Sequence, residues 1–310
     1  MGNILSMNAE KVSVIIPVYN EGNTIADLVA KIKSRYPDFE IIVIDDGSRD
    51  NTADAAQKAG ARVYSHPYNI GNGAAVKSGI RVAAGDIFVF LDGDGQHDPE
   101  DIAELLRYFP QFDMVVGARS MGDQASLGRA LGNKAYNWFA SYVAKFPIKD
   151  LTSGFRAVKS NIAKSFVYLL PNTYSYPATI TLGVLRGGMS VKYVPIKMRK
   201  RKTGKSNIKL IQDGVHFFMI ITRICTLYSP MRVFLPVSFT MFLLGLTNYI
   251  YTYLVHSRFT NMSVFLFVTA IIIFMMSLIS EQICQMRFER RATDRPVLKS
   301  KSSEKIDRRS

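Results

Sequence analysis

Two long uncharged runs near the C-terminal end restrict most strongly what this chain can fold into. Residues 233–255 and 262–280 contain no Asp, Glu, Lys, Arg or His. Apolar runs of about 23 and about 19 residues have the length needed to cross the hydrocarbon core of a bilayer. A short link, His256–Asn261, joins them. The pattern predicts a transmembrane helical hairpin over residues 231–281.

Basic residues flank the outer ends of this hairpin. The link carries only Arg258, whereas Arg223 and Arg232 precede the hairpin. The basic residues that follow it include Arg287, Arg290, Arg291, Arg295, Lys299 and Lys301. By the positive-inside rule, both chain termini and the catalytic part are expected in the cytoplasm, with the hairpin in the plasma membrane or an ER-type membrane. The first eleven residues have no apolar core, so no signal peptide is expected.

The net charge of the chain is +14, with 39 Lys and Arg against 25 Asp and Glu. Such a charge suits a nucleic acid, an anionic membrane surface or a phosphorylated substrate. Because the basic residues cluster beside the apolar runs, we expect anionic lipids as the partner and no nucleic acid. Residues 282–310 are predicted to form a basic, polar cytoplasmic tail.

Residues 208–230 alternate apolar and polar residues with a helical period, including Ile211, Val215 and Phe218 on one side. This pattern predicts an amphipathic helix at the membrane surface. A helix that packs on the preceding domain is the alternative interpretation.

Strands alternate with helices in the first 207 residues, which predicts an α/β domain with a mostly parallel sheet and helices on both faces. Strands are expected at 12–18, 40–44, 88–91 and 114–117, and a helix over 99–109. Polar residues follow the strands, among them Tyr19-Asn20-Glu21, Asp45-Asp46, His66–Asn69, Asp92, Asp94 and Arg119. Parallel strands deliver these residues to one edge of the sheet, where such folds bind ligands. No Gly-x-Gly-x-x-Gly or P-loop motif follows the first strand, which disfavours a dinucleotide or P-loop site.

The stretch from Phe88 to Asp98 carries two carboxylates one residue apart, directly after an apolar strand. Asp92, Asp94 and Gln96 can converge on one oxygen-preferring cation if the chain stays extended. The alternative is an acidic turn that caps a helix starting near Pro99, with Asp98 as its N-cap.

Three motifs resemble those of the family 2 glycosyltransferases with the GT-A fold, in composition and in spacing. They are Ile16-Pro-Val-Tyr-Asn-Glu21, Val43-Ile-Asp-Asp-Gly-Ser-Arg-Asp-Asn-Thr52 and Asp92-Gly-Asp-Gly-Gln96. Later segments are similar to the polyprenyl-phosphate branch typified by dolichol-phosphate mannosyltransferase. These are Gly117-Ala-Arg119, Arg129, Asp150-Leu-Thr-Ser-Gly-Phe155 and Arg201-Lys-Thr-Gly-Lys-Ser206. The resemblance covers roughly residues 12 to 210.

The resemblance implies a site for a nucleotide-sugar donor. It assigns the nucleoside to Pro17, Tyr19, Glu21, Asp45 and Asp46, and the diphosphate with Mg²⁺ or Mn²⁺ to Asp92, Asp94 and Gln96. Alternatively, Tyr19 packs at a helix entry and Asp46 forms an Asx-turn with Gly47.

The resemblance also implies positions for phosphate-binding cations. Arg119 and Arg129 occupy positions that hold the acceptor phosphate, and Arg201 one that holds the donor phosphate. Asn207 stands where a lysine is expected, so Lys205, or else Lys209, is assigned to that role. The alternative for residues 200–205 is a solvated basic loop.

The sequence thus predicts a GT-A catalytic domain (1–207), an amphipathic interfacial helix (208–230), the hairpin (231–281) and the tail (282–310). The resemblance implies an inverting transfer of a sugar from a UDP- or GDP-linked donor to undecaprenyl or dolichyl phosphate, with Asp94, Arg119 and Arg129 as catalytic residues. A phosphate dianion is already nucleophilic, so no general base is required. Two alternatives stay open: transfer to a glycan hydroxyl, and a nucleotide-sugar-binding membrane subunit without turnover.

Overall fold

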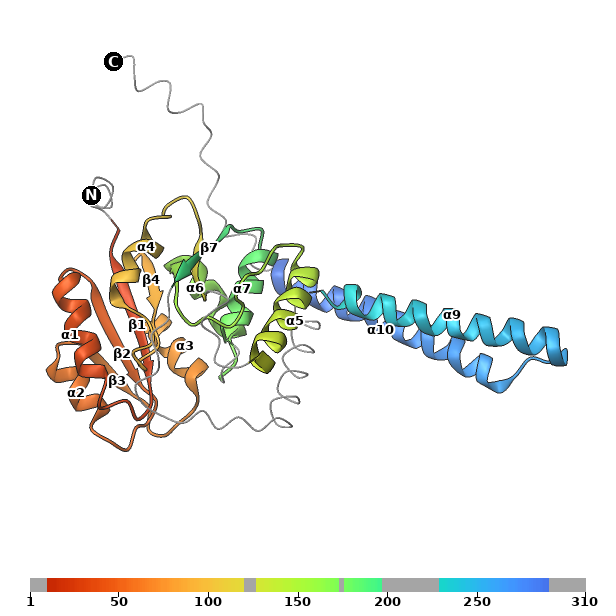
Figure 1. The fold of residues 1–310 in the computed structure, drawn as a ribbon, viewed down its shortest axis with the longest axis horizontal. Helices are drawn as coiled ribbons and strands as arrows, with labels where there is room; N and C mark the ends of the chain where they lie inside the picture. The colour runs from red at the N-terminus through yellow and green to blue at the C-terminus, as the bar shows by residue number, and fades with distance from the viewer. Residues whose placement is uncertain (1–9, 120–126, 173–175, 197–228, 290–310) are drawn as a thin grey trace, which may run out of the picture. The chain divides into compact units, whose positions relative to one another are not determined.

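The computed structural model describes residues 10–119, 127–172, 176–196 and 229–289. The chain divides into two compact units, residues 1–229 and 230–310. The first contains a seven-stranded sheet in the order β3-β2-β1-β4-β6-β5-β7 (Figure 1). The mostly parallel α/β sheet predicted from the sequence is therefore confirmed.

The strands are β1 (Val12–Val18), β2 (Glu40–Asp45), β3 (Arg62–Ser65), β4 (Ile87–Phe90), β5 (Met114–Arg119), β6 (Arg156–Lys159) and β7 (Val191–Ile196). The α-helices among the described residues of the first unit are α1 (Ile25–Arg35), α2 (Thr52–Lys58), α3 (Asn72–Val82), α4 (Ile102–Leu106), α5 (Leu127–Ala144), α6 (Ser160–Phe166) and α7 (Tyr176–Arg186). Short 3-10 helices span Pro99–Asp101 and Val167–Leu169.

Strand β6 runs antiparallel to both of its neighbours, β4 and β5, while the other paired strands are parallel. The sequence did not predict β6 or β7. It also predicted one helix over 99–109, where the structure has a 3-10 turn followed by the short helix α4. Asp98 caps this turn, because its side chain accepts a hydrogen bond from the Glu100 backbone N–H.

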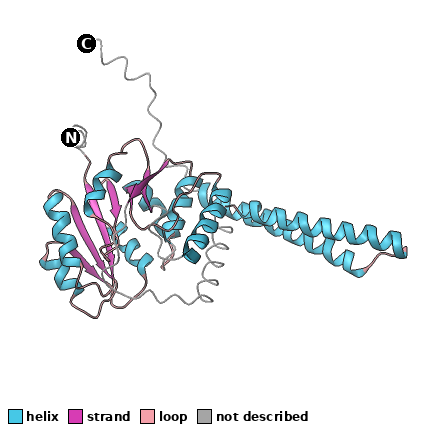
Figure 2. Cartoon of the chain, viewed as in Figure 1, coloured by secondary structure: helices cyan, strands magenta, loops and turns pink. Residues whose placement is uncertain are grey.

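Helices lie on both faces of the sheet (Figure 2), and the side chains of the central strands are buried on both faces. Helices α1 and α4 pack with Val14, Ile16 and Val43 on one face. Helix α3 lies against the other face, so closely that a β-carbon at Gly79 would come within 2.3 Å of Ile15 Cγ2. Burial of these residues on both faces holds the strand ends in fixed positions, and those ends carry the site.

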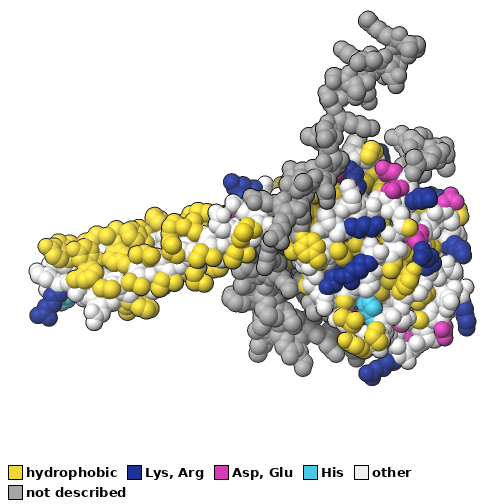
Figure 3. Space-filling model, turned by 180° about the vertical axis from the view of Figure 1, so that it is seen from behind, with side chains coloured by type: hydrophobic (Ala, Val, Ile, Leu, Met, Phe, Trp, Pro, Cys, Tyr) yellow, Lys and Arg dark blue, Asp and Glu magenta, His cyan; other side chains and the backbone are white. Residues whose placement is uncertain are grey.

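Within its described residues, the second unit has two apolar helices, α9 (Pro230–His256) and α10 (Asn261–Glu289), which form a hairpin. Ser238 Oγ donates to the Ala270 carbonyl of the other helix over 2.8 Å. Near the link, Asn248 Oδ1 accepts from Ser263 Oγ over 2.9 Å. The surface of both helices is dominated by hydrophobic side chains (Figure 3). Both are long and apolar enough to cross a membrane, which suggests a membrane protein with a helical hairpin.

Candidate active site

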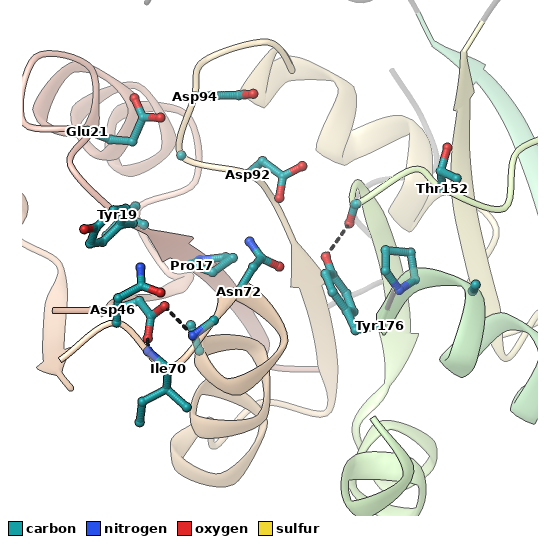
Figure 4. Close-up of a pocket in the computed structure, with 18 of the residues that line it drawn as sticks. Pro17, Tyr19, Glu21, Asp46, Ile70, Asn72, Asp92, Asp94, Thr152 and Tyr176 are labelled. Atoms are coloured by element: carbon teal, nitrogen blue, oxygen red, sulfur yellow. Dashed lines mark hydrogen bonds between the residues drawn. The ribbon is translucent and has the colours of Figure 1, made fainter. Parts of the chain in front are cut away.

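A pocket of about 730 Å³ opens at the carboxyl ends of β1, β2 and β4. Its lining includes residues 17–19, 21, 46, 69–72, 75, 92–94, 136, 151–152, 154 and 176–178. Six residues predicted from the sequence are thus brought together here: Pro17, Tyr19, Glu21, Asp46, Asp92 and Asp94. Figure 4 shows Tyr19 and Glu21 on one side of the pocket, and Thr152 and Tyr176 on the opposite side.

The segment that follows β1 is fastened to the segment that follows β2. Asn20 adopts a positive φ of 54°. Its backbone N–H donates to Ser48 Oγ over 2.9 Å, and its side-chain oxygen accepts from the Arg49 N–H over 2.9 Å. This turn leaves the ring of Tyr19 41% exposed at the pocket. Tyr19 is therefore partly exposed, and its ring is accessible to a planar base.

Asp46 is buried, and its carboxylate holds the loop that precedes α3. Oδ1 accepts from the Ile70 N–H over 3.0 Å and contacts His66 Nδ1 over 2.7 Å, while Oδ2 accepts from the Gly71 N–H over 2.8 Å. The carboxylate thus shapes the loop 69–72, which itself lines the pocket (Figure 4). In place of the alternative Asx-turn with Gly47, the carboxylate oxygens of Asp46 accept hydrogen bonds from this more distant loop.

Asp45, the neighbouring residue, is placed differently. Its Oδ1 accepts from the Ser48 N–H over 3.1 Å, and the side chain is buried. Asp45 is not among the described residues that line the pocket. The structure therefore separates the Asp-Asp pair into one residue that closes a turn and one that borders the pocket.

Asp92 lies against the backbone of the loop that leads into β6. A β-carbon at Gly154 would come within 2.5 Å of Asp92 Oδ2. Such a contact is too close for any side chain, so glycine is required at residue 154 while Asp92 keeps this position. Gly93 is likewise constrained, because a β-carbon there would lie 2.5 Å from Val18 Cγ1.

Asp94 also lines the pocket, and its Oδ1 accepts from the Gln96 backbone N–H over 3.1 Å. Gln96 itself is not among the described lining residues. The predicted trio is therefore represented in the pocket by its two carboxylates. Thr24 steadies the turn between them, since its Oγ1 donates to the Gly93 carbonyl over 3.0 Å.

The carboxylate oxygens at this pocket fit a hard divalent cation that also takes oxygen ligands from a substrate. Among the described residues, no cluster of three or more His, Cys, Asp or Glu is arranged to hold a metal ion. Two carboxylates, however, are what Mg²⁺ commonly takes from a protein when phosphate oxygens and waters complete its shell. Asp92 and Asp94 meet this requirement.

Arg119, at the end of β5, is paired with Asp150. Its Nε and Nη2 donate to the two carboxylate oxygens over 2.7 and 3.0 Å, and Nη2 also donates to Thr152 Oγ1. The hydrogen bonds with Asp150 raise the pKa of Arg119. Burial opposes ionisation of Asp150, but its bonds with Arg119 keep the pKa of this carboxyl below its ordinary value. Arg119 is not among the described residues that line the pocket, but it donates to Thr152, which does line it.

The other predicted phosphate-binding residues are not described. Arg129 belongs to the first turns of α5, but its side chain lies outside the described part of the structure. Arg201 and Lys205, together with Asn207 and Lys209, fall within residues 197–228, which also lie outside it. Their roles stay predictions.

His97 is buried directly after the acidic motif. Its ring stacks on Phe155 with centroids 4.9 Å apart. Burial and the nearby charge of Arg119 lower the pKa of His97 to about 4, so the ring is neutral at pH 7. His97 is thus a packing residue at the base of the loop.

Most of the far wall of the pocket was not predicted from the sequence. Tyr136, Thr152 and Tyr176 line this wall, and Tyr176 Oη donates to the Gly154 carbonyl over 3.4 Å (Figure 4). Burial raises the pKa of Tyr176, so its hydroxyl stays a hydrogen-bond donor. The Asp150–Phe155 motif was a signal for one part of this wall. Tyr136 and Tyr176 lie in apolar helices and carry no comparable sequence signal.

Two family models match the chain. Glycosyl transferase family 2 matches residues 13–166, and the GtrB C-terminal hairpin matches residues 229–286. Together they cover the strands that carry the acidic motifs and both apolar helices.

Similar proteins and structures agree with these matches. An undecaprenyl-phosphate 4-deoxy-4-formamido-L-arabinose transferase of Pseudomonas syringae is 28% identical over 254 residues, which are 76% of this chain and 71% of that protein. An undecaprenyl-phosphate mannosyltransferase of Micrococcus luteus is 26% identical over 212 residues, 64% of this chain and 87% of that protein.

The fold is also found among solved structures. The structure of glucosyl-3-phosphoglycerate synthase from Mycobacterium tuberculosis, in complex with Mn²⁺, UDP and glucosyl-3-phosphoglycerate, superposes with a TM-score of 0.58 at 21% identity. The match covers 72% of this chain and 81% of that one. The chain is a glycosyltransferase of family 2 with the GT-A fold, and it carries a GtrB-type C-terminal hairpin.

Proposed function

We propose that this protein transfers a sugar, with inversion, from a UDP- or GDP-linked donor to the phosphate of a polyprenyl phosphate, undecaprenyl or dolichyl. One observation carries the proposal: a single pocket joins the ends of β1, β2 and β4 in a chain that also has an apolar hairpin. The pocket offers a binding site for a soluble donor, and the apolar hairpin would hold the protein in the membrane that contains a lipid acceptor. The similar proteins named above include two transferases whose names specify undecaprenyl phosphate.

The donor nucleoside binds between Tyr19 and the loop 69–72. The exposed ring of Tyr19 stacks on the base, and Glu21 accepts hydrogen bonds from base or ribose. Asp46 acts mainly by fixing the loop, because its oxygens already accept hydrogen bonds from Ile70 and Gly71. Asp45 contributes to donor binding indirectly, by closing the turn with Ser48 that follows β2.

Asp92 and Asp94 would hold Mg²⁺ or Mn²⁺ at the diphosphate end of the donor. Such an ion offsets the negative charge that develops on the departing nucleoside diphosphate. The mycobacterial synthase of the same fold was solved with Mn²⁺ and UDP. The protein's own contribution is to keep the two carboxylates at fixed positions next to the pocket, which the turn hydrogen bonds of Asp94 and Thr24 support.

The acceptor phosphate approaches on the side of Arg119 and Arg129, with Arg201 and Lys205 assigned to the donor phosphate. A guanidinium binds phosphate oxygens in a bidentate manner, and the polyprenyl tail stays in the bilayer near the hairpin. Nε and Nη2 of Arg119 already donate to Asp150. Arg119 therefore offers its remaining N–H groups to the acceptor phosphate, or releases Asp150 when the phosphate binds.

The chemical step needs positioning more than proton transfer. A phosphate monoester has a second pKa near 6 and is largely a dianion at pH 7, so one of its oxygens attacks the anomeric carbon without a general base. Attack in line with the leaving diphosphate inverts the configuration. His97, buried and neutral, is not required as a base.

The reaction takes place at the cytoplasmic face, because the basic residues on both sides of the hairpin favour that orientation. Nucleotide sugars are then supplied directly from the cytoplasm. Anionic lipids attract the basic tail and strengthen membrane binding.

The test uses membranes that contain the full-length protein, a panel of radiolabelled UDP- and GDP-sugars, and either undecaprenyl or dolichyl phosphate. Label should enter the organic extract from one donor and should be released by mild acid, as expected for a glycosyl phosphate. An Asp94→Asn variant in the same membranes should give no labelled lipid.

The other outcomes identify the alternatives. Label in a polysaccharide or protein fraction, with none in lipid, would reveal a hydroxyl acceptor. Binding of a nucleotide sugar without any product from any donor would reveal a subunit without turnover. Either result contradicts the proposal.

A further inference from the structure

Arg156, the first residue of β6, is a fully buried arginine behind the pocket. Its Nη1 donates to the Pro177 carbonyl over 2.8 Å and to Thr181 Oγ1 over 2.9 Å, and Nη2 donates to the Ser153 carbonyl. These acceptors are all neutral. Among the described residues, Nε has no hydrogen-bond partner.

A buried guanidinium with neutral partners is costly, and an apolar side chain of similar volume usually fills such a space at no loss of stability. Burial lowers the pKa of Arg156, and the nearby groups of Tyr176, Tyr193, Asp150 and Asp92, in order of decreasing effect, act in the opposite direction. Packing alone therefore does not account for an arginine here. Its planar fork is suited to hold several carbonyl groups at fixed positions.

The groups that Arg156 holds belong to the far wall of the pocket. Ser153 precedes Gly154, which lines the pocket, and Pro177 lies in the first turn of α7 and lines it too. In the sheet, Arg156 pairs with Phe90, at the end of the strand that leads to Asp92. Arg156 is thus hydrogen-bonded next to Gly154 and paired in the sheet with the strand that leads to Asp92. Gly154 and Asp92 are the two sides of one contact.

That contact is between Gly154 and the carboxylate of Asp92. A β-carbon on Gly154 would lie 2.5 Å from Oδ2 and 3.0 Å from Cγ of Asp92, so the carboxylate rests directly on the glycine backbone. The Gly154 carbonyl accepts from Tyr176 Oη over 3.4 Å (Figure 4). The position of Gly154 therefore limits where the carboxylate of Asp92 can lie on this side.

We infer that Arg156 is a positioning residue, which sets the carboxylate of Asp92 for metal binding by fixing the Ser153–Gly154 backbone. The inference builds on the proposed function, in which Asp92 holds the divalent ion. Arg156 itself contacts neither the ion nor the substrates.

The experiment measures Mn²⁺ binding by the full-length protein in detergent, independently of turnover. Mn²⁺ is titrated with and without UDP or GDP, and free Mn²⁺ is read by electron paramagnetic resonance. Arg156→Lys keeps the charge and loses the fork, and Arg156→Met keeps much of the volume and loses both. Each should weaken Mn²⁺ binding about tenfold, and Gly154→Ala should weaken it to a similar extent.

The double variant Arg156→Lys with Gly154→Ala separates positioning from general destabilisation. Because both changes act on the same contact, the double variant should bind Mn²⁺ about as weakly as the more affected single variant. Lys159→Met is the matched control on the same strand. It removes the 2.8 Å ion pair with Asp113 away from the pocket, and should lower thermal stability while leaving Mn²⁺ affinity unchanged.

Unchanged Mn²⁺ affinity in folded Arg156 variants, or additive losses in the double variant, would overturn the inference. If the Arg156 variants do not fold, Thr181→Val removes one acceptor of the fork, and unchanged affinity in that variant would overturn it equally. Failure of the wild-type protein to bind Mn²⁺ under any of these conditions would instead contradict the metal role in the proposed function.

Discussion

Arg119 Nε lies 2.7 Å from Asp150 Oδ2, and this ion pair joins the end of β5 to the loop that precedes β6. Oδ1 of Asp150 also accepts from the backbone N–H groups of Thr152 and Ser153. The buried carboxylate of Asp150 thus binds both the guanidinium of Arg119 and the loop that lines the pocket. Removing it should affect the stability of the domain and its pH dependence.

Asp150→Ala should lower the free energy of unfolding by about 3 kcal/mol, the cost of breaking a buried ion pair by removing one partner. Chemical denaturation followed by circular dichroism measures this loss. Glu100→Ala, an exposed carboxylate on the 3-10 turn, is the control and should change stability much less. A loss below about 1 kcal/mol for Asp150→Ala would contradict a structural role for the pair.

The same carboxylate should make stability depend on pH. Folding lowers the pKa of Asp150, so its contribution is complete above the ordinary pKa of 3.8 and is lost as the pH falls through the lower folded value. Below about pH 4, the thermal midpoint of the wild-type protein should therefore fall more steeply than that of Asp150→Asn. Parallel curves for the two proteins would disprove the linkage.

Removal of divalent ions should abolish transfer, and Mn²⁺ or Mg²⁺ should restore it. Asp94→Asn should lower kcat at least about a hundredfold, because the charge on the departing diphosphate then lacks its counter-ion. Asp98→Asn in the same loop is the matched control. Asn serves as an N-cap as well as Asp does, so this variant should keep wild-type rates. Equal rates for the two variants would refute the metal assignment.

Gly47→Ala should impair donor binding through the loop that follows β3. Gly47 has a φ of +73°, and a β-carbon there would lie 2.5 Å from the Tyr68 carbonyl carbon. Backbone cannot move aside as a flexible side chain can, so the loop shifts, and KM for the donor should rise about fivefold or more.

Gly60→Ala provides the comparison for this variant. Gly60 also has a positive φ, of +96°, but a β-carbon there meets the flexible end of Lys33. Both variants should lose about 1–2 kcal/mol of stability, whereas only Gly47→Ala should raise KM. Equal KM values would show that the loop does not contribute to donor binding.

The neighbouring aspartates Asp45 and Asp46 should differ in their effect on the donor. Asp46→Asn presents an amide to N–H donors from Ile70 and Gly71, and should raise KM for the donor about tenfold. Asp45→Asn can still accept from the Ser48 N–H and should change KM less than about twofold. Steady-state kinetics over a range of donor concentrations decides this. Equal effects would show that both carboxylates contact the nucleotide.

The orientation of the hairpin can be measured by labelling cysteines in intact cells. With Cys225 and Cys284 replaced by Ala, Arg258→Cys in the link between α9 and α10 should react with a membrane-impermeant maleimide from outside. Lys11→Cys, exposed on the first unit, should react only after the cells are opened. The reverse pattern would place the catalytic unit on the other side of the membrane.

Much of the architecture was predictable because it depends on local patterns. Apolar runs that end in polar residues located β1, β2, β4 and β5, and the parallel arrangement followed from the alternation with helices. Strand β6 was missed because it reads Arg-Ala-Val-Lys, four residues whose buried arginine hides the apolar signal. Its antiparallel placement between β4 and β5 depends on partners that are far away in the sequence.

The sequence by itself determined which side chains reach the carboxyl edge of the sheet, because strand periodicity and parallel pairing direct them there. It also determined the apolar hairpin, because backbone in a bilayer must satisfy its hydrogen bonds within helices. Only the tertiary structure decided which oxygens are already engaged. It separated Asp45 from Asp46, paired Arg119 with Asp150, and placed Gly154 and Tyr176 opposite the motif strands. Hydrogen bonds and close packing depend on neighbours in space, and no pattern along the chain specifies those neighbours.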